Sequence, residues 1–101
     1  MSNTKLDCTS LSEVTDITSQ CSYDDKKSGD SISRVSCCQD DGYNELENKL
    51  KTYIKENPAL SEQDILQAMC KCCNDIEQQS RTHKVFDDCV SRILFEILKG
   101  K

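Results

Sequence analysis

The chain has 101 residues, a formal net charge of −5 and eight cysteines, and this length fits one domain over residues 1–101. An acidic chain without a run of Lys or Arg lacks the positive surface that binds nucleic acid or an anionic membrane, so neither partner is expected. No apolar stretch is long enough for a transmembrane helix.

Residues that build protein cores are scarce. Leu, Ile, Val and Phe account for 21 of the 101 residues, and there is no Trp. This fraction is near the limit at which chains stop folding through hydrophobic burial alone. Small domains of this kind need cross-links, and the cysteines are the obvious candidates.

A first helix is expected over residues 11–20. Residues 10–13 read Ser-Leu-Ser-Glu, which matches the capping-box pattern at the start of a helix. Leu11, Val14 and Ile17 then follow at helical spacing.

Residues 22–31 are polar, charged and contain a Gly, which predicts an exposed loop. Loops on a rigid scaffold often carry binding residues, and this loop combines an aromatic side chain with both signs of charge. A solvated loop with no binding role would explain the same composition. The candidate partner contacts are Tyr23, Asp24, Asp25, Lys26 and Lys27. A short helix is expected next, over Ile32–Gln39.

A clear amphipathic helix is predicted over Tyr43–Glu56, with apolar residues on one stripe and charged residues opposite. Asn57 and Pro58 end it, because the residue before a proline avoids the helical conformation. The stripe consists of Tyr43, Leu46, Leu50, Tyr53 and Ile54.

The next helix is expected to begin after Ser61, which with Asp64 approximates a capping box. Its apolar face contains Ile65, Met69, Cys72 and Ile76.

The last helix is predicted over His83–Lys99, with Thr82 as its N-terminal cap and Gly100 at the C-terminal cap position. Apolar pairs recur along it at helical spacing and give a wide apolar stripe. The sequence thus predicts an all-α fold, a compact bundle of four to five short helices.

An even number of cysteines at high density in a short chain is typical of the disulfide framework of a secreted protein, so about four disulfides are expected. Adjacent cysteines point in different directions and should bond elsewhere. The bridges should therefore join separate segments, with residues 61–79 as a central helix linked to the N-terminal segments and to Cys89. The cysteines are Cys8, Cys21, Cys37, Cys38, Cys70, Cys72, Cys73 and Cys89.

A zinc or thiol site is the competing interpretation of the same cysteines. Cys70 and Cys73 form a C-x-x-C pair and His83 follows, but the second ligand pair of a zinc site is missing. A redox pair would lie at a helix N-terminus, whereas Cys70 is about nine residues into its helix. No metal or cofactor is therefore expected. No catalytic residue is expected either, because no nucleophile motif accompanies His83.

The cysteine order Cys8, Cys21, Cys37-Cys38, Cys70-x-Cys72 is similar to that of the plant eight-cysteine lipid-transfer proteins, but Cys73 stands where that family has a long spacer. The small size, the acidic composition and the cysteine-bearing helices Ile65–Ile76 and Val85–Leu98 resemble those of small helical proteins of arthropod saliva and venom, such as the sand-fly salivary anti-complement type. That resemblance implies an extracellular inhibitor of a host protein or protease cascade.

These observations predict a secreted, non-enzymatic, monomeric protein that binds and inhibits an extracellular host protein. Disulfides would fix its surface before binding and so reduce the entropy lost on association. Two alternatives remain at this stage. One is an extracellular signalling ligand of the pheromone or cytokine type, and the other is an intracellular zinc- or thiol-binding helical protein.

Overall fold

The computed structural model describes residues 6–9, 11–20, 35, 37, 44–77 and 80–100. Within these ranges the regular elements are helices, which confirms the predicted all-α class. They are α1 (Thr15–Thr18), α3 (Asn44–Glu56), α4 (Glu62–Asp75) and α5 (His83–Gly100). In the same ranges, no helix is both long and apolar enough to cross a membrane.

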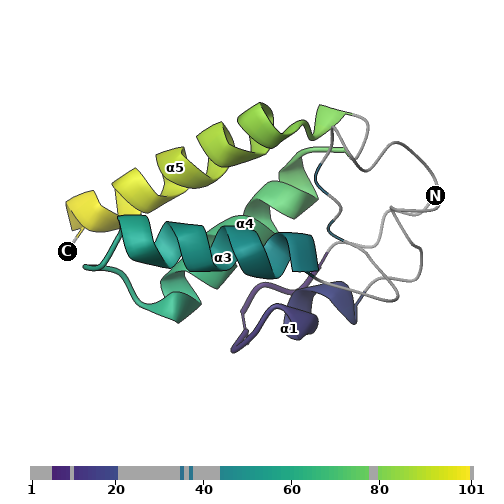
Figure 1. Cartoon of the computed structure of the whole chain (residues 1–101), viewed down its shortest axis with the longest axis horizontal. Coiled ribbons are helices and arrows are strands. Elements are labelled where there is room, and N and C mark those ends of the chain that lie inside the picture. Colours follow the sequence, from purple (N-terminus) through teal and green to yellow (C-terminus); the bar gives the residue numbers. More distant parts are fainter. Residues whose placement is uncertain are drawn as a thin grey trace.

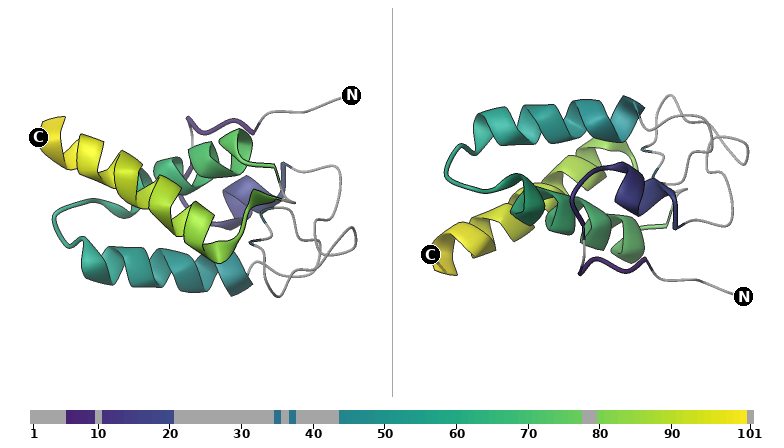
Figure 2. Two further views of the ribbon diagram at one scale, coloured as in Figure 1. Left: turned by 90° about the horizontal axis from the view of Figure 1, so that it is seen from above. Right: turned by 90° about the horizontal axis from the view of Figure 1, so that it is seen from below.

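The central element is α4, which contacts both α3 and α5 (Figure 1). A short connection over residues 57–61 turns the chain back, so α3 and α4 run antiparallel, and α5 again runs opposite to α4. Figure 2 shows α1 beside the C-terminal half of α4. Because each neighbour uses a different side of α4, this helix is largely enclosed, with seven buried residues.

Both predicted N-terminal caps of the longer helices are confirmed. At α4, the Ser61 hydroxyl accepts a hydrogen bond from the Asp64 N–H at 3.1 Å, and the Asp64 carboxylate accepts one from the Ser61 N–H at 3.5 Å. At α5, the Thr82 hydroxyl accepts from the Val85 N–H at 3.3 Å. These bonds satisfy N–H groups that have no partner within the helix. Gly100, expected beyond the last helix, is instead its final residue.

The first helix is shorter than predicted. Its regular part is only Thr15–Thr18, and Ser10 lies outside the described residues. The carboxylate of Asp16 accepts hydrogen bonds from the Ser12 N–H at 2.7 Å and from the Glu13 N–H at 3.1 Å. These bonds hold the preceding residues in turns, so side-chain bonding to the backbone replaces the helical pattern expected there.

The helix predicted over Ile32–Gln39 is wrong at the two residues of it that the structure describes, because neither Val35 nor Cys37 is helical. The Val35 N–H donates instead to the carbonyl of Arg81 at 2.8 Å. Both residues are buried, and Cys37 is bonded to Cys73. Contacts with residues distant in sequence therefore fix this segment, and the local pattern could not show them.

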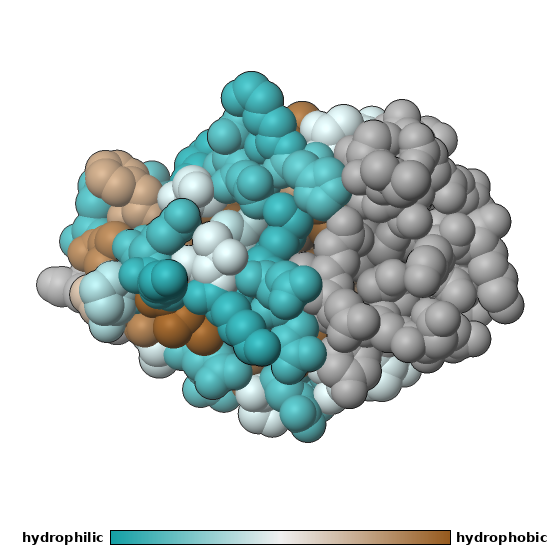
Figure 3. Space-filling model, viewed as in Figure 1, coloured by the Kyte–Doolittle hydropathy of each residue, from teal (hydrophilic) through white to brown (hydrophobic). Residues whose placement is uncertain are grey.

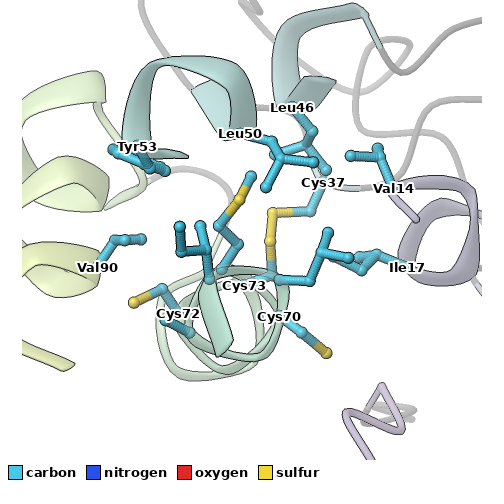
Figure 4. Close-up of a cluster of buried hydrophobic side chains, with 14 of the residues drawn as sticks. Val14, Ile17, Cys37, Leu46, Leu50, Tyr53, Cys70, Cys72, Cys73 and Val90 are labelled. Carbon is cyan, nitrogen blue, oxygen red and sulfur yellow. A yellow bond between two sulfur atoms is a disulfide. The ribbon is translucent and has the colours of Figure 1, made fainter. Parts of the chain in front are cut away.

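Three disulfides leave α4 in three directions. Cys70 is bonded to Cys8, Cys73 to Cys37, and Cys72 to Cys89 of α5, with Cα–Cα distances of 5.8, 6.1 and 6.0 Å. In Figure 4, the labelled side chains of the three α4 cysteines radiate from the helix toward different neighbours. This agrees with the expected central helix linked to the N-terminal segments and to Cys89. The remaining cysteines, Cys21 and Cys38, lie outside the described residues.

Arg81 is a buried charged residue, only 3% exposed. Its guanidinium donates to the Ile76 carbonyl at 3.0 and 3.2 Å, to the Cys73 carbonyl at 3.3 Å and to the Val35 carbonyl at 3.0 Å. The last turn of α4 contains no basic residue, so Arg81 supplies the donors that its final carbonyls require. The helix ends at Asp75, earlier than predicted, because Ile76 is extended and Arg81 takes the place of a further helical turn in bonding the Cys73 carbonyl.

A second polar contact joins α3 to α5. The Tyr53 hydroxyl and the Lys49 ammonium both donate to the same carboxylate oxygen of Asp87, and the Lys49 distance is 3.0 Å. Burial of Tyr53 raises its pKa, and the hydrogen bond to Asp87 and the charge of that carboxylate raise it further. The neutral phenol is therefore strongly favoured in the folded state.

Replacing Arg81 should destabilise the fold strongly. Arg81→Ala leaves the buried carbonyls of Cys73 and Val35 without their donor, and we expect a loss of about 3 kcal/mol in the free energy of unfolding, measured by urea denaturation of the oxidised protein. Arg92→Ala, at an exposed position of α5, is the matched control and should change the value by less than about 0.5 kcal/mol. Equal effects of the two substitutions would contradict the role assigned to Arg81.

The raised pKa of Tyr53 predicts an alkaline loss of stability. The phenol ionises near its ordinary pKa of 10.0 in the unfolded chain but only at higher pH in the folded one, so its contribution is complete below that value and is lost as the pH rises above it. Urea denaturation at about pH 8 and about pH 11 should show a larger decrease for the natural chain than for Tyr53→Phe. Identical decreases in both would refute this assignment.

Candidate functional site

An open groove of about 740 Å³ lies between α4, α5 and the N-terminal segment of residues 6–9. Ala68 on α4, Ile93 and Ile97 on α5, and Leu6 provide apolar lining. Ala68 is buried, whereas the three larger side chains are half-buried and so keep apolar surface available within the groove. Sites of this size with apolar walls are typical of ligand and peptide binding.

Charged and polar side chains line the same groove. Lys71 and Asp75 extend from α4, Glu96 extends from α5, and Gln67 adds an amide. All four are exposed. The formal charge of the lining is −1, because one ammonium faces two carboxylates. The groove therefore combines an apolar floor with a mixed, slightly acidic rim.

The wall formed by residues 6–9 is held against α4 by a side chain that pairs with the backbone. The Leu6 N–H donates to the Asn74 side-chain oxygen at 2.8 Å, and the Asn74 amide donates to the Leu6 carbonyl at 3.0 Å. One turn earlier on α4, Cys70 is bonded to Cys8. The left panel of Figure 2 shows this segment beside the C-terminal end of α4. Two hydrogen bonds and one covalent bond thus fix the wall.

Gln20 holds the neighbouring residue of the same segment in the same manner. Its side-chain oxygen accepts from the Asp7 N–H at 2.6 Å, and its amide donates to the Asp7 carbonyl at 2.9 Å. The Asp7 carboxylate in turn accepts from the hydroxyl and the N–H of Thr9, which lowers its pKa. The backbone N–H and carbonyl of Leu6 are therefore paired with the Asn74 amide, and those of Asp7 are paired with the Gln20 amide.

Among the described residues, the large apolar side chains that are exposed outside the groove belong to α5. Its large exposed side chains are Val85, Phe95 and Leu98, and Phe95 is 59% exposed. The Lys99 ammonium lies 5.7 Å from the centre of the Phe95 ring, so a cation–π contact within the helix partly covers this ring. In Figure 3, apolar surface is visible at the end of the molecule where α5 terminates, while most of the described surface on this face is hydrophilic.

The structure describes some of the site residues predicted from the sequence and leaves others outside the described ranges. The predicted contact loop, Tyr23 to Lys27, lies outside the described residues. His83 is the first residue of α5 and is half-buried. The C-x-C-C cluster of α4 is bonded to other cysteines, so its sulfurs are not the thiolates that zinc requires. Across the described ranges, no three His, Cys, Asp or Glu residues gather as metal ligands.

Sequence reasoning missed the residues that shape the groove. Asn74 stands four positions after Cys70, so it lies on the side of α4 that a bridging cysteine already marks. That spacing is the one local signal available for it. Gln20 has no comparable signal, because its partner, Asp7, is thirteen residues away and in an extended segment.

Asn74→Ala should loosen the groove wall without unfolding the protein. We expect exchange of the Leu6 amide hydrogen to accelerate by about tenfold or more, because the acceptor for that N–H is lost. Gln67→Ala, also in the groove lining, is the control and should leave this exchange rate unchanged. Asn74→Asp keeps an acceptor oxygen and should retain most of the protection, as hydrogen-exchange NMR can measure. Unchanged exchange in Asn74→Ala would show that Asn74 is not needed to hold the wall.

Comparison of the chain with family models, with curated proteins and with solved structures gives no match. The function is therefore inferred from the chain's own contacts, in which the cross-linked segment of residues 6–9 and two helices line an open apolar groove with a charged rim.

Proposed function

We propose that this chain is a secreted, non-enzymatic protein that binds an extracellular host protein and blocks it by covering part of its surface. The observation that carries the proposal is the set of three disulfides centred on α4. Disulfides form and persist in oxidising, extracellular environments. They also link α4 covalently to the N-terminal segment, to residue 37 and to α5.

Rigidity matters for binding because a protein that is already ordered loses less conformational entropy when a complex forms. The α4 disulfides close loops with sequence separations of 62, 36 and 17 residues, so much of the chain is restrained before a partner arrives. The groove wall is restrained twice, by the Cys8–Cys70 bond and by the Asn74 amide. A surface restrained in this way suits occlusion of a partner better than a change of shape around it.

Capture from plasma tests the proposal. The oxidised protein, immobilised through its C-terminus, should retain one plasma protein saturably, and the soluble protein should inhibit the complement or protease cascade that contains the captured component. The matched control is the same chain after reduction and alkylation, which should lose both activities with the restraints. Absence of saturable capture by the folded, oxidised protein would overturn the proposal, and saturable binding to a cell-surface receptor instead would favour a signalling ligand.

A further inference from the structure

Two exposed carboxylates mark positions near opposite ends of the groove. Asp75 lies near the end of α4, and Glu96 lies in the C-terminal part of α5. Among the described residues neither makes an ion pair, in contrast to Asp88, which binds Lys84 at 3.2 Å on α5. Carboxylates that make no ion pair among the described residues can bind a cationic group of another molecule.

The Cys72–Cys89 disulfide allows the distance between these carboxylates to be judged. It places Cys72 and Cys89 opposite each other on the two helices, with their Cα atoms 6.0 Å apart. Because α4 and α5 run antiparallel, three residues lead from Cys72 to Asp75 in one direction and seven lead from Cys89 to Glu96 in the other (Figure 1). At the helical rise per residue, the two acidic positions are about 15 Å apart along the groove.

The apolar lining lies largely between these two positions. Ile93 and Ala68 are each four residues from the disulfide, on the side of Glu96, and Leu6 is paired with Asn74, next to Asp75. Lys71 also falls between the carboxylates, one residue from Cys72. The order along the groove is therefore acidic at Asp75, then apolar with one ammonium, then acidic at Glu96, with Ile97 one residue beyond.

We infer that the groove binds an extended segment of the partner protein with a basic residue at each end and an apolar residue between them. An extended chain advances about 3.4 Å per residue, so two basic side chains four positions apart span about 14 Å, close to the calculated separation of the Asp75 and Glu96 positions along the helices. In such a segment the first, third and fifth side chains share one face, which places the central apolar side chain over the groove floor.

The charge of the groove favours a segment with basic ends over one with acidic ends. The charged residues of the groove lining, Lys71, Asp75 and Glu96, carry a formal net charge of −1, which favours a basic segment over an acidic one. Lys71 disfavours a third basic residue at the centre, because like charges repel. The inference rests on the proposed function, since it gives the chemistry of the protein segment that the groove would recognise.

Titration of the ¹⁵N-labelled, oxidised protein with three synthetic peptides tests the inference. Acetyl-Lys-Thr-Leu-Thr-Lys-amide should shift the amide signals of residues 67–75 and 93–97 saturably. The peptide with Ser in place of Leu and the peptide with Glu in place of both Lys residues should each bind about tenfold or more weakly. Equal binding of all three peptides, or none at millimolar concentration, would overturn the inference.

Two variants of α5 sharpen the test. Glu96→Lys should weaken binding of the basic peptide about tenfold or more, while Asp88→Lys, which changes an exposed carboxylate outside the groove lining, should leave it unchanged. Asp75→Lys combined with Glu96→Lys should reverse the preference in favour of the Glu peptide. If the cationic detergent dodecyltrimethylammonium saturates the same signals and the basic peptide does not, the groove is a site for small amphiphiles and the inference fails.

The plasma experiment separates this inference from the proposed function. A captured plasma protein that binds Glu96→Lys as tightly as the natural chain would leave the proposed function standing and refute the groove as its site. Selective binding of the basic peptide without capture of any plasma protein would preserve the groove specificity and refute inhibition of a host plasma protein.

Discussion

The structure depends on the directions in which three cysteines leave a single helix. Successive residues of an α-helix are turned by about 100°, so Cys70, Cys72 and Cys73 cannot point the same way. Each is bonded to a different part of the chain: the N-terminal segment, α5 or residue 37. One helix is thereby cross-linked to three other parts of the chain, which compensates for a core that draws on only 21 Leu, Ile, Val and Phe residues.

Arg81 completes this arrangement with hydrogen bonds instead of a covalent bond. Its guanidinium joins the end of α4 to Val35, two residues from the Cys37–Cys73 disulfide. The Val35 N–H returns a bond to the Arg81 carbonyl, so backbone and side chain of one residue fix the same segment. The planar guanidinium presents several donors in a fixed geometry, which a lysine in this position could not reproduce.

An element could be predicted from the sequence where the contacts that determine it join residues close together in the chain. The starts of α4 and α5 were predictable, because the caps Ser61 and Thr82 lie within three residues of the groups they bind. The shortness of the first helix was not predictable, because the Asp16 carboxylate competes for the backbone N–H of Ser12. The non-helical conformation of Val35 was not predictable either, because its N–H bonds a carbonyl 46 residues away. The groove was hidden for the same reason, since its walls meet only after residues 6–9 and α5 have packed on α4.

The positions of the disulfides along the chain also constrain the order in which the protein can assemble. Cys8 and Cys37 leave the ribosome long before Cys70 and Cys73, so neither of these two bridges can close until α4 has been synthesised. Bringing distant segments together costs more chain entropy than joining near ones. Of the three disulfides within the described residues, the Cys72–Cys89 bridge between α4 and α5 spans the fewest residues, 17, and therefore costs the least chain entropy to close. We therefore expect the N-terminal wall of the groove to be added after α4 and α5 have been joined.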